Sequence, residues 1–356
     1  MKRILVTGCG PASTNFVKSL RIVQEKFFIV QTDANKYHTY LSLAERTYLV
    51  PKATDPEYIS KLNEIIEKEM IEFLHPQPDI EVRVIGKNRD KVGAVTFLPS
   101  QRAIEICQDK YKSYECWKRK GLPVPKTVEI ERESDITKAF DELGAPIWIR
   151  AKHGAGGRGS TPAENEEAAI SWIKYWKSRG VNWEFIAQEY LPGRNIAFHS
   201  LWKNGELIIS MARERLEYIY PYLAPSGITG TPSVQKTIHD EEVNKIATEA
   251  VLSIDPNFSG IACVDLKENS QGIPCPTEIN AGRMFTTSFF FSLLSNVLYK
   301  DYRANFPYLY IKLAYKEEIP DLPKYNILPK NVYWIRHMDS PGRIVMNGKI
   351  LGVMYR

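Results

Sequence analysis

The sequence predicts an α/β protein that opens with a parallel sheet and continues into an α+β body. Three observations lead to this prediction. The first hundred residues alternate short apolar runs with helical stretches. From residue 109 the chain carries longer strands, two of them joined by an Asn-Gly turn. With 356 residues, 44% of them hydrophobic, the chain is long enough for two or three packed domains.

The N-terminal segment has the pattern of strand, glycine turn, helix and strand. An apolar run at 3–7 ends in a Gly-Cys-Gly-Pro turn, a helical stretch follows, and a second apolar run ends at Asp33. This order opens a parallel α/β sheet. Further elements of this region are expected at 48–50, 56–70, 73–76 and 94–98.

A second region begins near residue 109 and has a different texture. Strand-like runs flank Lys203-Asn204-Gly205, whose Asn-Gly pair is a strong hairpin signal. Helices are expected at 109–120, 134–143, 164–178 and 240–252. Strands are expected at 126–130, 146–151, 185–189, 195–202, 206–213, 259–267 and 274–280. A Pro-rich stretch after 315 leads to short strand-like pieces at 332–354.

Composition excludes several classes of protein. The net charge is +5, with both signs interspersed, whereas nucleic-acid binders usually gather Lys and Arg on one stripe, so we expect no nucleic-acid partner. Five cysteines without a CxxC pair or zinc-like spacing are typical of a cytoplasmic protein. The most apolar segment, 289–294, is too short to span a bilayer, and no signal-peptide pattern opens the chain, so we expect no membrane partner.

The first glycine turn is open to two interpretations. Gly8 and Gly10 follow the first strand, and Asp33 ends the second, as in the start of a dinucleotide fingerprint. Ser13 occupies the position of the third glycine, so the pattern is incomplete. The turn is either a tight strand-to-helix connection or part of an NAD site. The helix N-terminus there could also hold an anionic substrate group.

A second glycine loop is more informative. Gly154, Gly156, Gly157 and Gly159 lie within six residues, shortly after Arg150 at the end of an apolar strand. Glycines let backbone N–H groups wrap around phosphate oxygens, and the arginine adds positive charge. The loop is not a Walker loop, because no Gly-Lys-Ser/Thr ends it. A phosphate-covering lid is therefore predicted, with a merely solvated loop as the alternative.

Two neighbouring strands carry oxygen ligands. Asp265 lies on one apolar strand, and Glu278 and Asn280 lie on the next, where alternation points both to one face. Two carboxylates and an amide oxygen suit Mg²⁺ that bridges ATP phosphates. An exposed strand face is the alternative interpretation. Arg283, shortly after the second strand, favours the metal site because it adds a cation beside it.

In this order, the motifs resemble the ATP-grasp superfamily, particularly single modules of the carbamoyl-phosphate synthetase large subunit and of biotin carboxylase. The resemblance covers nearly the whole chain. It implies a Rossmann-like pre-ATP-grasp domain and a two-lobed ATP-grasp fold. The implied parts are a pre-ATP-grasp domain at 1–107, a small lobe with the glycine-rich lid at 108–190, a large lobe with the metal site at 191–315, and a C-terminal extension packing on the body at 316–356.

The resemblance also assigns residues that bind the ATP phosphates. Lys110, at the start of the helix before Gly-Leu-Pro-Val-Pro, matches the first phosphate cation of the family. Arg150 matches the second, and residues 154–159 match the loop that covers the phosphates.

The adenosine end has its own matches. Glu189, Tyr190 and Leu191 resemble the interdomain hinge, whose backbone contacts adenine and whose apolar residues pack on it. Asn195 stands where the family usually places a Glu that holds the ribose hydroxyls. An Asn can still hydrogen-bond a ribose.

At the metal end, Glu278 and Asn280 match the Glu-x-Asn of the family, and Asp265 takes the place of the first metal ligand. The arginine that usually follows is displaced by one residue, to Arg283, which is expected to serve the transition state or grip substrate. Arg213, with Arg215 two residues later, is expected at the end of a strand near the phosphates, where one of the two arginines would help hold an acylphosphate. A surface ion pair is the alternative for Arg213.

The implied cofactors are ATP and Mg²⁺ (or Mn²⁺), and the implied partners are a small carboxylate and an amine. By resemblance, the carboxylate attacks the γ-phosphate to give an acylphosphate, and the amine then displaces the phosphate. Two other functions stay open: an NAD-dependent oxidoreductase acting on a nucleotide-sugar-type substrate, and a noncatalytic ATP-binding module. A homodimer also stays open.

Overall fold

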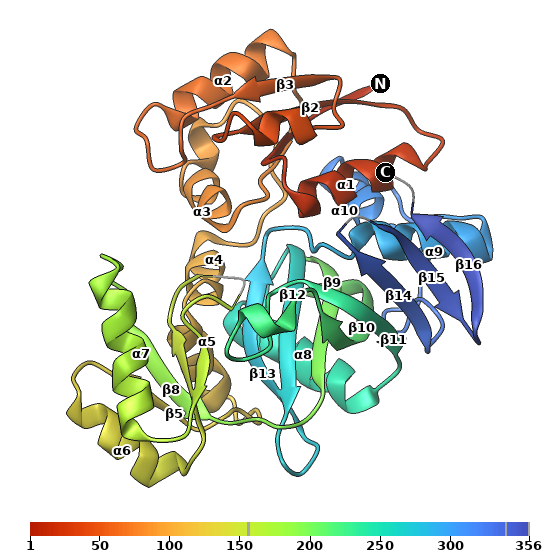
Figure 1. Cartoon of the computed structure of the whole chain (residues 1–356). Coiled ribbons are helices and arrows are strands. Elements are labelled where there is room, and N and C mark those ends of the chain that lie inside the picture. Colours follow the sequence, from red (N-terminus) through yellow and green to blue (C-terminus); the bar gives the residue numbers. More distant parts are fainter. Residues whose placement is uncertain (155–156, 339, 355–356) are drawn as a thin grey trace.

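The computed structural model describes residues 1–154, 157–338 and 340–354. Within these residues the strands form three sheets, each with its own helices (Figure 1). The predicted fold class is confirmed: a parallel α/β sheet opens the chain, and mixed α/β parts follow. Among the described residues, no helix is both long and apolar enough to cross a membrane.

The N-terminal sheet is parallel, with the order β3-β2-β1-β4. Buried apolar residues of β1 pair in register with both neighbours, and the helices pack around the sheet. The strands are β1 (Lys2–Thr7), β2 (Phe27–Asp33), β3 (Arg46–Leu49) and β4 (Phe73–His75). The helices are α1 (Pro11–Arg21), α2 (Tyr58–Lys68), α3 (Asp79–Lys87) and α4 (Gln101–Cys107). The run expected at 94–98 adds a single bridge, between Val95 and Phe73.

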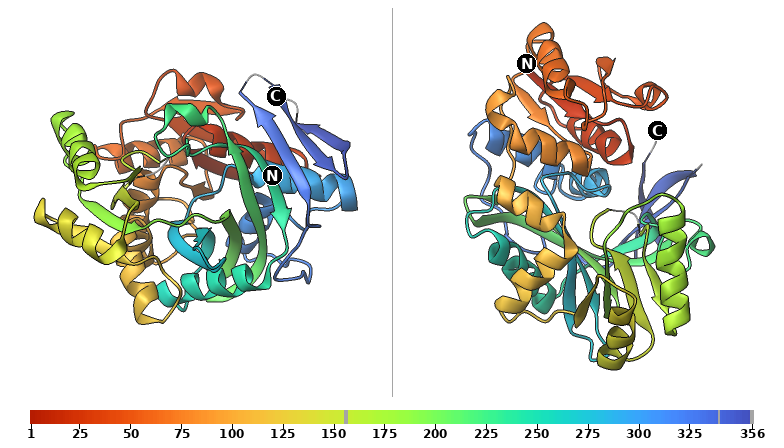
Figure 2. Two further views of the ribbon diagram at one scale, coloured as in Figure 1. Left: turned by 60° about the horizontal axis from the view of Figure 1, so that its bottom comes forward. Right: turned by 90° about the vertical axis from the view of Figure 1, so that its left-hand side faces the viewer.

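A small antiparallel sheet follows, with the order β5-β8-β6-β7. Two amphipathic helices pack on it and bury Ile136, Ala139 and Ile173 against the strands. The right-hand view of Figure 2 shows this lobe opposite the N-terminal sheet. Its elements are β5 (Thr127–Ile130), α6 (Ser134–Leu143), β6 (Ile147–Ala151), β7 (Thr161–Ala163), α7 (Glu166–Ser178) and β8 (Phe185–Glu189).

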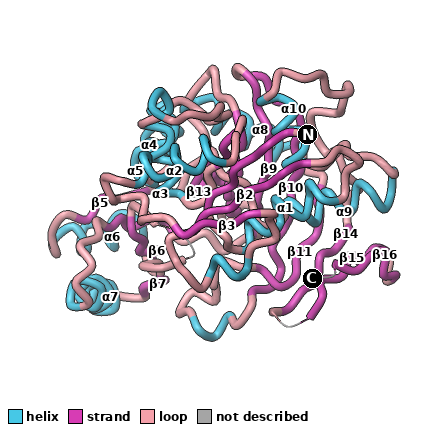
Figure 3. The backbone as a smooth tube through the Cα atoms, turned by 90° about the horizontal axis from the view of Figure 1, so that it is seen from above, coloured by secondary structure: helices cyan, strands magenta, loops and turns pink. Residues whose placement is uncertain are grey.

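The largest sheet has the order β13-β12-β9-β10-β11-β14-β15-β16, and its neighbouring strands are antiparallel. The predicted Asn204-Gly205 turn joins β9 to β10 with both residues at positive φ, as a type I′ hairpin requires. The strands are β9 (Asn195–Lys203), β10 (Glu206–Tyr218), β11 (Pro232–Ile238), β12 (Gly260–Glu268), β13 (Pro274–Ala281), β14 (Val332–His337), β15 (Ser340–Met346) and β16 (Lys349–Met354). The C-terminal segment thus extends this sheet by three strands (Figure 3).

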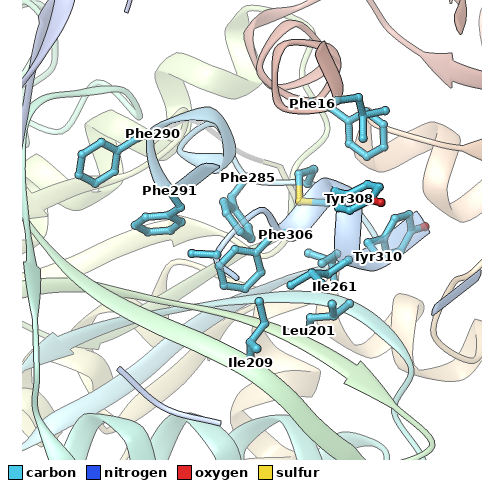
Figure 4. Close-up of a cluster of buried hydrophobic side chains, with 14 of the residues drawn as sticks. Phe16, Leu201, Ile209, Ile261, Phe285, Phe290, Phe291, Phe306, Tyr308 and Tyr310 are labelled. Carbon is cyan, nitrogen blue, oxygen red and sulfur yellow. The ribbon is translucent and has the colours of Figure 1, made fainter. Parts of the chain in front are cut away.

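The two faces of the large sheet are covered by different helices. α5 (Lys110–Arg119) and α8 (Glu241–Ile254) pack on one face, against side chains such as Phe198 and Val264. α9 (Ser288–Tyr299) and α10 (Phe306–Ala314) cover the other face together with α1. Figure 4 shows this second core, in which aromatic rings from the helices pack over Leu201, Ile209 and Ile261. The polar residues at one end of this second face form the candidate site.

Candidate active site

One cavity lies where the small sheet, the large sheet and two loops meet. Most of the predicted site residues line it, including the phosphate cations, the hinge and the metal-ligand residues. β6 and β8 supply one wall, and β9, β10, β12 and β13 supply the other. Gly154, Gly157, Arg158 and Ser160 of the glycine loop border the cavity, as do Ile228 and Gly230 of the loop after β10. Gly159, also predicted to bind phosphate, is not among the lining residues and lies against Trp183. Gly156, predicted to bind phosphate, lies outside the described residues.

The predicted metal ligands come together across two paired strands. Asp265 of β12 lies directly opposite Glu278 of β13, and Cys263 lies opposite Asn280 in the same antiparallel register. The pleat therefore turns both carboxylates and the Asn280 amide toward one face. All three side chains line the cavity.

Two cations meet at Glu278. Arg150 Nη2 donates to its carboxylate at 2.7 Å, and Lys110 Nζ lies 3.5 Å from the same oxygen. Burial alone would raise the pKa of Glu278, but these cations lower it to about 2. Burial lowers the pKa of Lys110, although Glu278 opposes that effect. The carboxylate is thus charged and neutralised by the side chains that the sequence assigns to ATP phosphates.

The glycine loop lies against the same cations. Lys110 Nζ donates to the Gly154 carbonyl at 2.7 Å. Gly157 and Gly159 have φ angles of +73° and +74°, in the left-handed region that favours glycine. A Cβ on Gly157 would lie 2.8 Å from the Ile228 carbonyl oxygen, so the glycine permits a close approach of two loops over the cavity.

The hinge residues form an apolar wall at the small-lobe side. Leu191 is buried, and the Tyr190 ring lies 6.4 Å from the Trp148 ring, centroid to centroid. The Glu189 carboxylate accepts a hydrogen bond from the Lys126 backbone N–H at 3.3 Å, which ties the hinge to the chain before β5. Apolar and aromatic side chains of this kind line most small-molecule sites.

Asn195 is already hydrogen-bonded. Its amide donates to the Tyr218 hydroxyl at 2.8 Å and accepts from Arg215 Nη1 at 2.7 Å. Arg215 Nη2 also donates to Asp265 at 2.5 Å, so one guanidinium joins the predicted ribose position to the predicted metal position. Burial raises the pKa of Asp265, and Arg215 opposes that rise.

Arg283 lies beside the metal-ligand residues. Its guanidinium pairs with Asp79 at the start of α3, with an N–O distance of 2.6 Å, and it donates to Asn280. Gly282 precedes it with φ of +75°, which turns the chain at the end of β13. The arginine therefore links the N-terminal domain to the metal-ligand strand.

Arg213 lines the cavity from β10. Its side chain is 3% exposed, and its Nε donates to His199 Nε2 at 2.8 Å. Burial, followed by the proximity of Arg215, lowers the pKa of Arg213 to about 9, so the guanidinium is charged at neutral pH. Within the described residues, no carboxylate forms an ion pair with it.

Comparison with known families matches two models to this chain. A model described as an ATP-grasp domain matches residues 107–287, and one described as a PylC-like N-terminal domain matches residues 4–97. The chain belongs to the ATP-grasp family. The family resemblance predicted from the sequence is thereby confirmed.

Relatives of this ATP-grasp protein include two kinds of biosynthetic enzyme. It is 25% identical over 277 residues to the carbamoyl phosphate synthase large chain of Campylobacter jejuni, covering 71% of this chain and 24% of that protein. It is 25% identical over 185 residues to biotin carboxylase 1 of Bacillus subtilis, covering 49% of this chain and 40% of that protein. The chain thus spans about a quarter of the synthase length and less than half of the carboxylase length.

Solved ATP-grasp structures share its fold. N5-carboxyaminoimidazole synthetase from Staphylococcus aureus complexed with ADP has a TM-score of 0.70 at 16% identity, covering 94% of this chain and 82% of that one. L-amino acid ligase from Bacillus licheniformis has a TM-score of 0.68 at 13% identity, covering 97% and 80%.

The donor set of this ATP-grasp site fits Mg²⁺. Within the described ranges, no group of three or more His, Cys, Asp or Glu could hold a metal by itself. Mg²⁺, however, usually takes one or two protein carboxylates and leaves its other positions to phosphates and water. The facing pair Asp265 and Glu278, with the Asn280 amide beside them, matches that need.

His199, Tyr218 and Lys267 are among the polar residues that line the cavity without a role assigned from the sequence. Strand alternation could have found two of them. Lys267 lies two residues after Asp265, and His199 lies four residues after Asn195. Tyr218 follows a β-bulge in β10, which breaks the alternation.

The first glycine turn has few free donors for a pyrophosphate. The Gly8 N–H donates to the Thr32 carbonyl at 2.7 Å, and the Cys9 N–H donates to the Asp33 carboxylate at 2.8 Å. A dinucleotide fingerprint would aim such groups at phosphate. The NAD hypothesis therefore gains no support from this turn.

Proposed function

We propose that this chain is an ATP-dependent ligase that phosphorylates a carboxylate with Mg-ATP and transfers the resulting acyl group to an amine or similar nucleophile. The observation that carries the proposal is the facing pair Asp265 and Glu278, with Lys110 and Arg150 directed at the same carboxylate. Relatives named as carbamoyl phosphate synthase and biotin carboxylase support the ligase class.

In the first step, a carboxylate oxygen of the substrate attacks the γ-phosphorus of ATP, and the bond from that phosphorus to the bridging oxygen of ADP breaks. Phosphoryl transfer needs positioning and charge stabilisation more than covalent help from the protein. Lys110 and Arg150 are proposed to bind the phosphates from the small-lobe side, under the loop at 154–159. Arg283 is proposed to stabilise charge at the metal end, and Arg213 to help hold the acylphosphate.

In the second step, the nucleophile nitrogen attacks the carbonyl carbon, the bond from that carbon to the phosphate oxygen breaks, and inorganic phosphate leaves. The nitrogen loses its proton to solvent or to the phosphate. A loop that closes over the site would exclude water, which would otherwise hydrolyse the acylphosphate.

Two cofactor roles follow for the remaining residues. Asp265, Glu278 and Asn280 are proposed to hold Mg²⁺, which when bound neutralises charge on the ATP phosphates. Glu189, Tyr190 and Leu191 are proposed to hold adenine, and Asn195 the ribose.

The function is tested by an ADP-release screen of carboxylates and amines with Mg-ATP. We expect ADP to form with at least one acid and one nucleophile, and Glu278→Ala to abolish that turnover because it removes a metal ligand and unpairs two cations. Glu278→Gln, which preserves side-chain shape, should fail equally. ATP binding without ADP release across the panel would instead favour the noncatalytic module.

A matched control is Glu206→Ala. Glu206 is exposed and forms a surface ion pair with Lys324 at 3.0 Å, outside the cavity. Its loss should leave turnover unchanged. Near-normal activity in a folded Glu278→Ala protein would sink the metal assignment.

A further inference from the structure

Arg213 is a buried cation of the cavity, and among the described residues its guanidinium forms no ion pair with an acidic side chain. Arg150 and Lys110 meet Glu278, and Arg215 meets Asp265. Arg213, in contrast, makes one hydrogen bond, through Nε to His199, and its Nη1 is buried without a partner among the described residues.

A buried guanidinium without a counter-ion is energetically costly. Removing a cation from water loses several kcal/mol of solvation unless an anion or hydrogen-bond acceptors replace that water. His199 does not supply the missing charge, since burial, followed by the proximity of Arg213, keeps the pKa of this fully buried imidazole well below its usual value. The neutral ring accepts the Nε hydrogen bond and leaves both terminal nitrogens of Arg213 for another group.

The sheet register places Arg213 in one row with the metal ligands. Glu278 pairs with Asp265, Asp265 pairs with Ala197, and Ala197 pairs with Arg213. The Arg213 and Asp265 backbones are thus two strand spacings apart, roughly 10 Å. Ala197, the residue between them, is fully buried, and the Arg215 guanidinium crosses from β10 to Asp265 beside it, so the cavity holds Arg213 and the metal-ligand residues on its two sides.

The phosphate cations lie at the opposite end of that row. Lys110 and Arg150 contact Glu278 on β13, three strands from Arg213 on β10. ATP phosphates bound between these cations and the metal ligands would leave Arg213 on the other side of the reacting phosphorus. A nucleophile attacking in line must come from the side opposite the leaving ADP.

We propose that Arg213 binds the carboxylate of the acid substrate before phosphoryl transfer, so that the site holds this carboxylate in the cavity on the β10 side of the metal ligands. This inference rests on the proposed function and deepens it. It makes Arg213 a ground-state ligand of the acid, separate from the phosphate cations. The bound carboxylate supplies the charge that this guanidinium lacks.

The test compares wild type with Arg213→Met and Arg213→Lys. Calorimetry first measures MgADP affinity for each protein. Thermal shift at saturating MgADP then measures binding of bicarbonate, acetate, L-alanine and succinate, each titrated alone at constant ionic strength. We expect at least one carboxylate to stabilise wild type, with an apparent Kd weakened about 10- to 100-fold in Arg213→Met and less in Arg213→Lys. MgADP affinity should not change.

Arg336→Met is the matched control. Arg336 is half-buried, and its Nε donates to the Pro232 carbonyl at 3.1 Å, but it lies on β14 outside the cavity. The Arg336→Met protein should bind carboxylates as tightly as wild type does. Arg213→Met removes an uncompensated buried charge, so its Tm without carboxylate should be at least as high as that of wild type. A weaker response to carboxylate in this variant would then reflect lost binding and not lost folding.

The results test the role of Arg213 separately from the proposed ATP-dependent ligase function. Equal carboxylate stabilisation of wild type and Arg213→Met, or no stabilisation of wild type by any of the four acids, would overturn the assignment of Arg213 while MgADP still binds. Absence of MgADP binding to wild type would instead contradict the ATP site itself.

Discussion

The carboxylates of the cavity are already neutralised by cations of this chain. Glu278 is held by Arg150 and Lys110, and Asp265 is held by Arg215. Under the proposed function, Asp265 and Glu278 would hold the metal ion, and Lys110, Arg150 and Arg215 would then be released from these carboxylates to pair with the phosphates. Such an exchange keeps buried charges paired at each stage, which limits the desolvation cost of binding.

Arg150 provides a test of this exchange. We expect Arg150→Ala to weaken Mg-ATP binding about 10- to 100-fold, because the lost charge-assisted contact to phosphate outweighs the release of Glu278. Calorimetry of Mg-ATP binding measures the effect. Arg132→Ala, which removes an exposed arginine paired with Asp135, is the control and should bind as wild type does. An unchanged Mg-ATP affinity in Arg150→Ala would refute the phosphate role.

The placement of a single residue in the cavity was predictable where alternation along one strand determines which face of the sheet its side chain lies on. Glu278 and Asn280 follow from that rule, and the structure places them together with Asp265. The links from Asn195 through Arg215 to Asp265 were not predictable, since they depend on β9 lying between β10 and β12. Alternation along one strand does not reveal which strand lies beside it.

Among the elements of the site, the glycine loop requires glycine for two separate geometric reasons. Gly157 combines positive φ with a close approach to the Ile228 carbonyl oxygen, whereas Gly180 after α7 has φ of +74° and open space around its Cβ position. An alanine at either position pays the left-handed conformational penalty, about 1 kcal/mol. An alanine at 157 must in addition push the two loops apart.

We therefore expect Gly157→Ala to weaken Mg-ATP binding about tenfold and Gly180→Ala to lower stability alone. Calorimetry of Mg-ATP binding and thermal unfolding of both variants provide the measurements. Equal Mg-ATP affinity in the two variants would show that the approach of the loop at 157 to Ile228 has no part in nucleotide binding.

Elements with a clear period or turn signal were predicted well. The helix at 134–143 and the strand at 185–189 match the structure to the residue, and the Asn-Gly turn lies where expected. α9 and α10 were not predicted as helices. Both are apolar on nearly every side because they are buried in the second core, so they lack the amphipathic period that marks a surface helix.

At the scale of the whole molecule, the N-terminal domain supports the loop that follows the metal-ligand strand. Gln77 Nε2 donates to the Met284 carbonyl at 2.7 Å, and Asn15 Nδ2 donates to the Thr286 carbonyl at 2.6 Å. These bonds join side chains of the first domain to backbone more than 200 residues later. No periodicity or composition rule predicts such contacts, although the order of the domains was predictable.

His75 lies at the same junction. It is fully buried, stacks on Phe16 with ring centroids 4.5 Å apart, and hydrogen-bonds Tyr310 of α10 at 3.2 Å and Gln77 at 3.1 Å. Burial lowers its pKa to about 4, despite the opposing hydrogen bond with Gln77. The folded protein therefore favours the neutral ring more strongly than the unfolded chain does.

This shift makes the junction sensitive to acid. The stabilisation from neutral His75 is complete above about pH 6.5, the pKa of a histidine in the unfolded chain. It is lost as the pH falls toward 4, because the unfolded chain binds a proton at His75 and the folded protein does not. We expect the free energy of unfolding of wild type to fall by up to about 3 kcal/mol between pH 6.5 and 4, and that of His75→Gln to depend less on pH. The free energy of unfolding by urea at pH 7, 6, 5 and 4 measures it, and other titrating groups cancel in the difference between proteins. His337→Gln, at an exposed histidine, should follow wild type. If the free energies of unfolding of wild type and His75→Gln changed with pH in parallel, His75 would not be the source of the acid sensitivity.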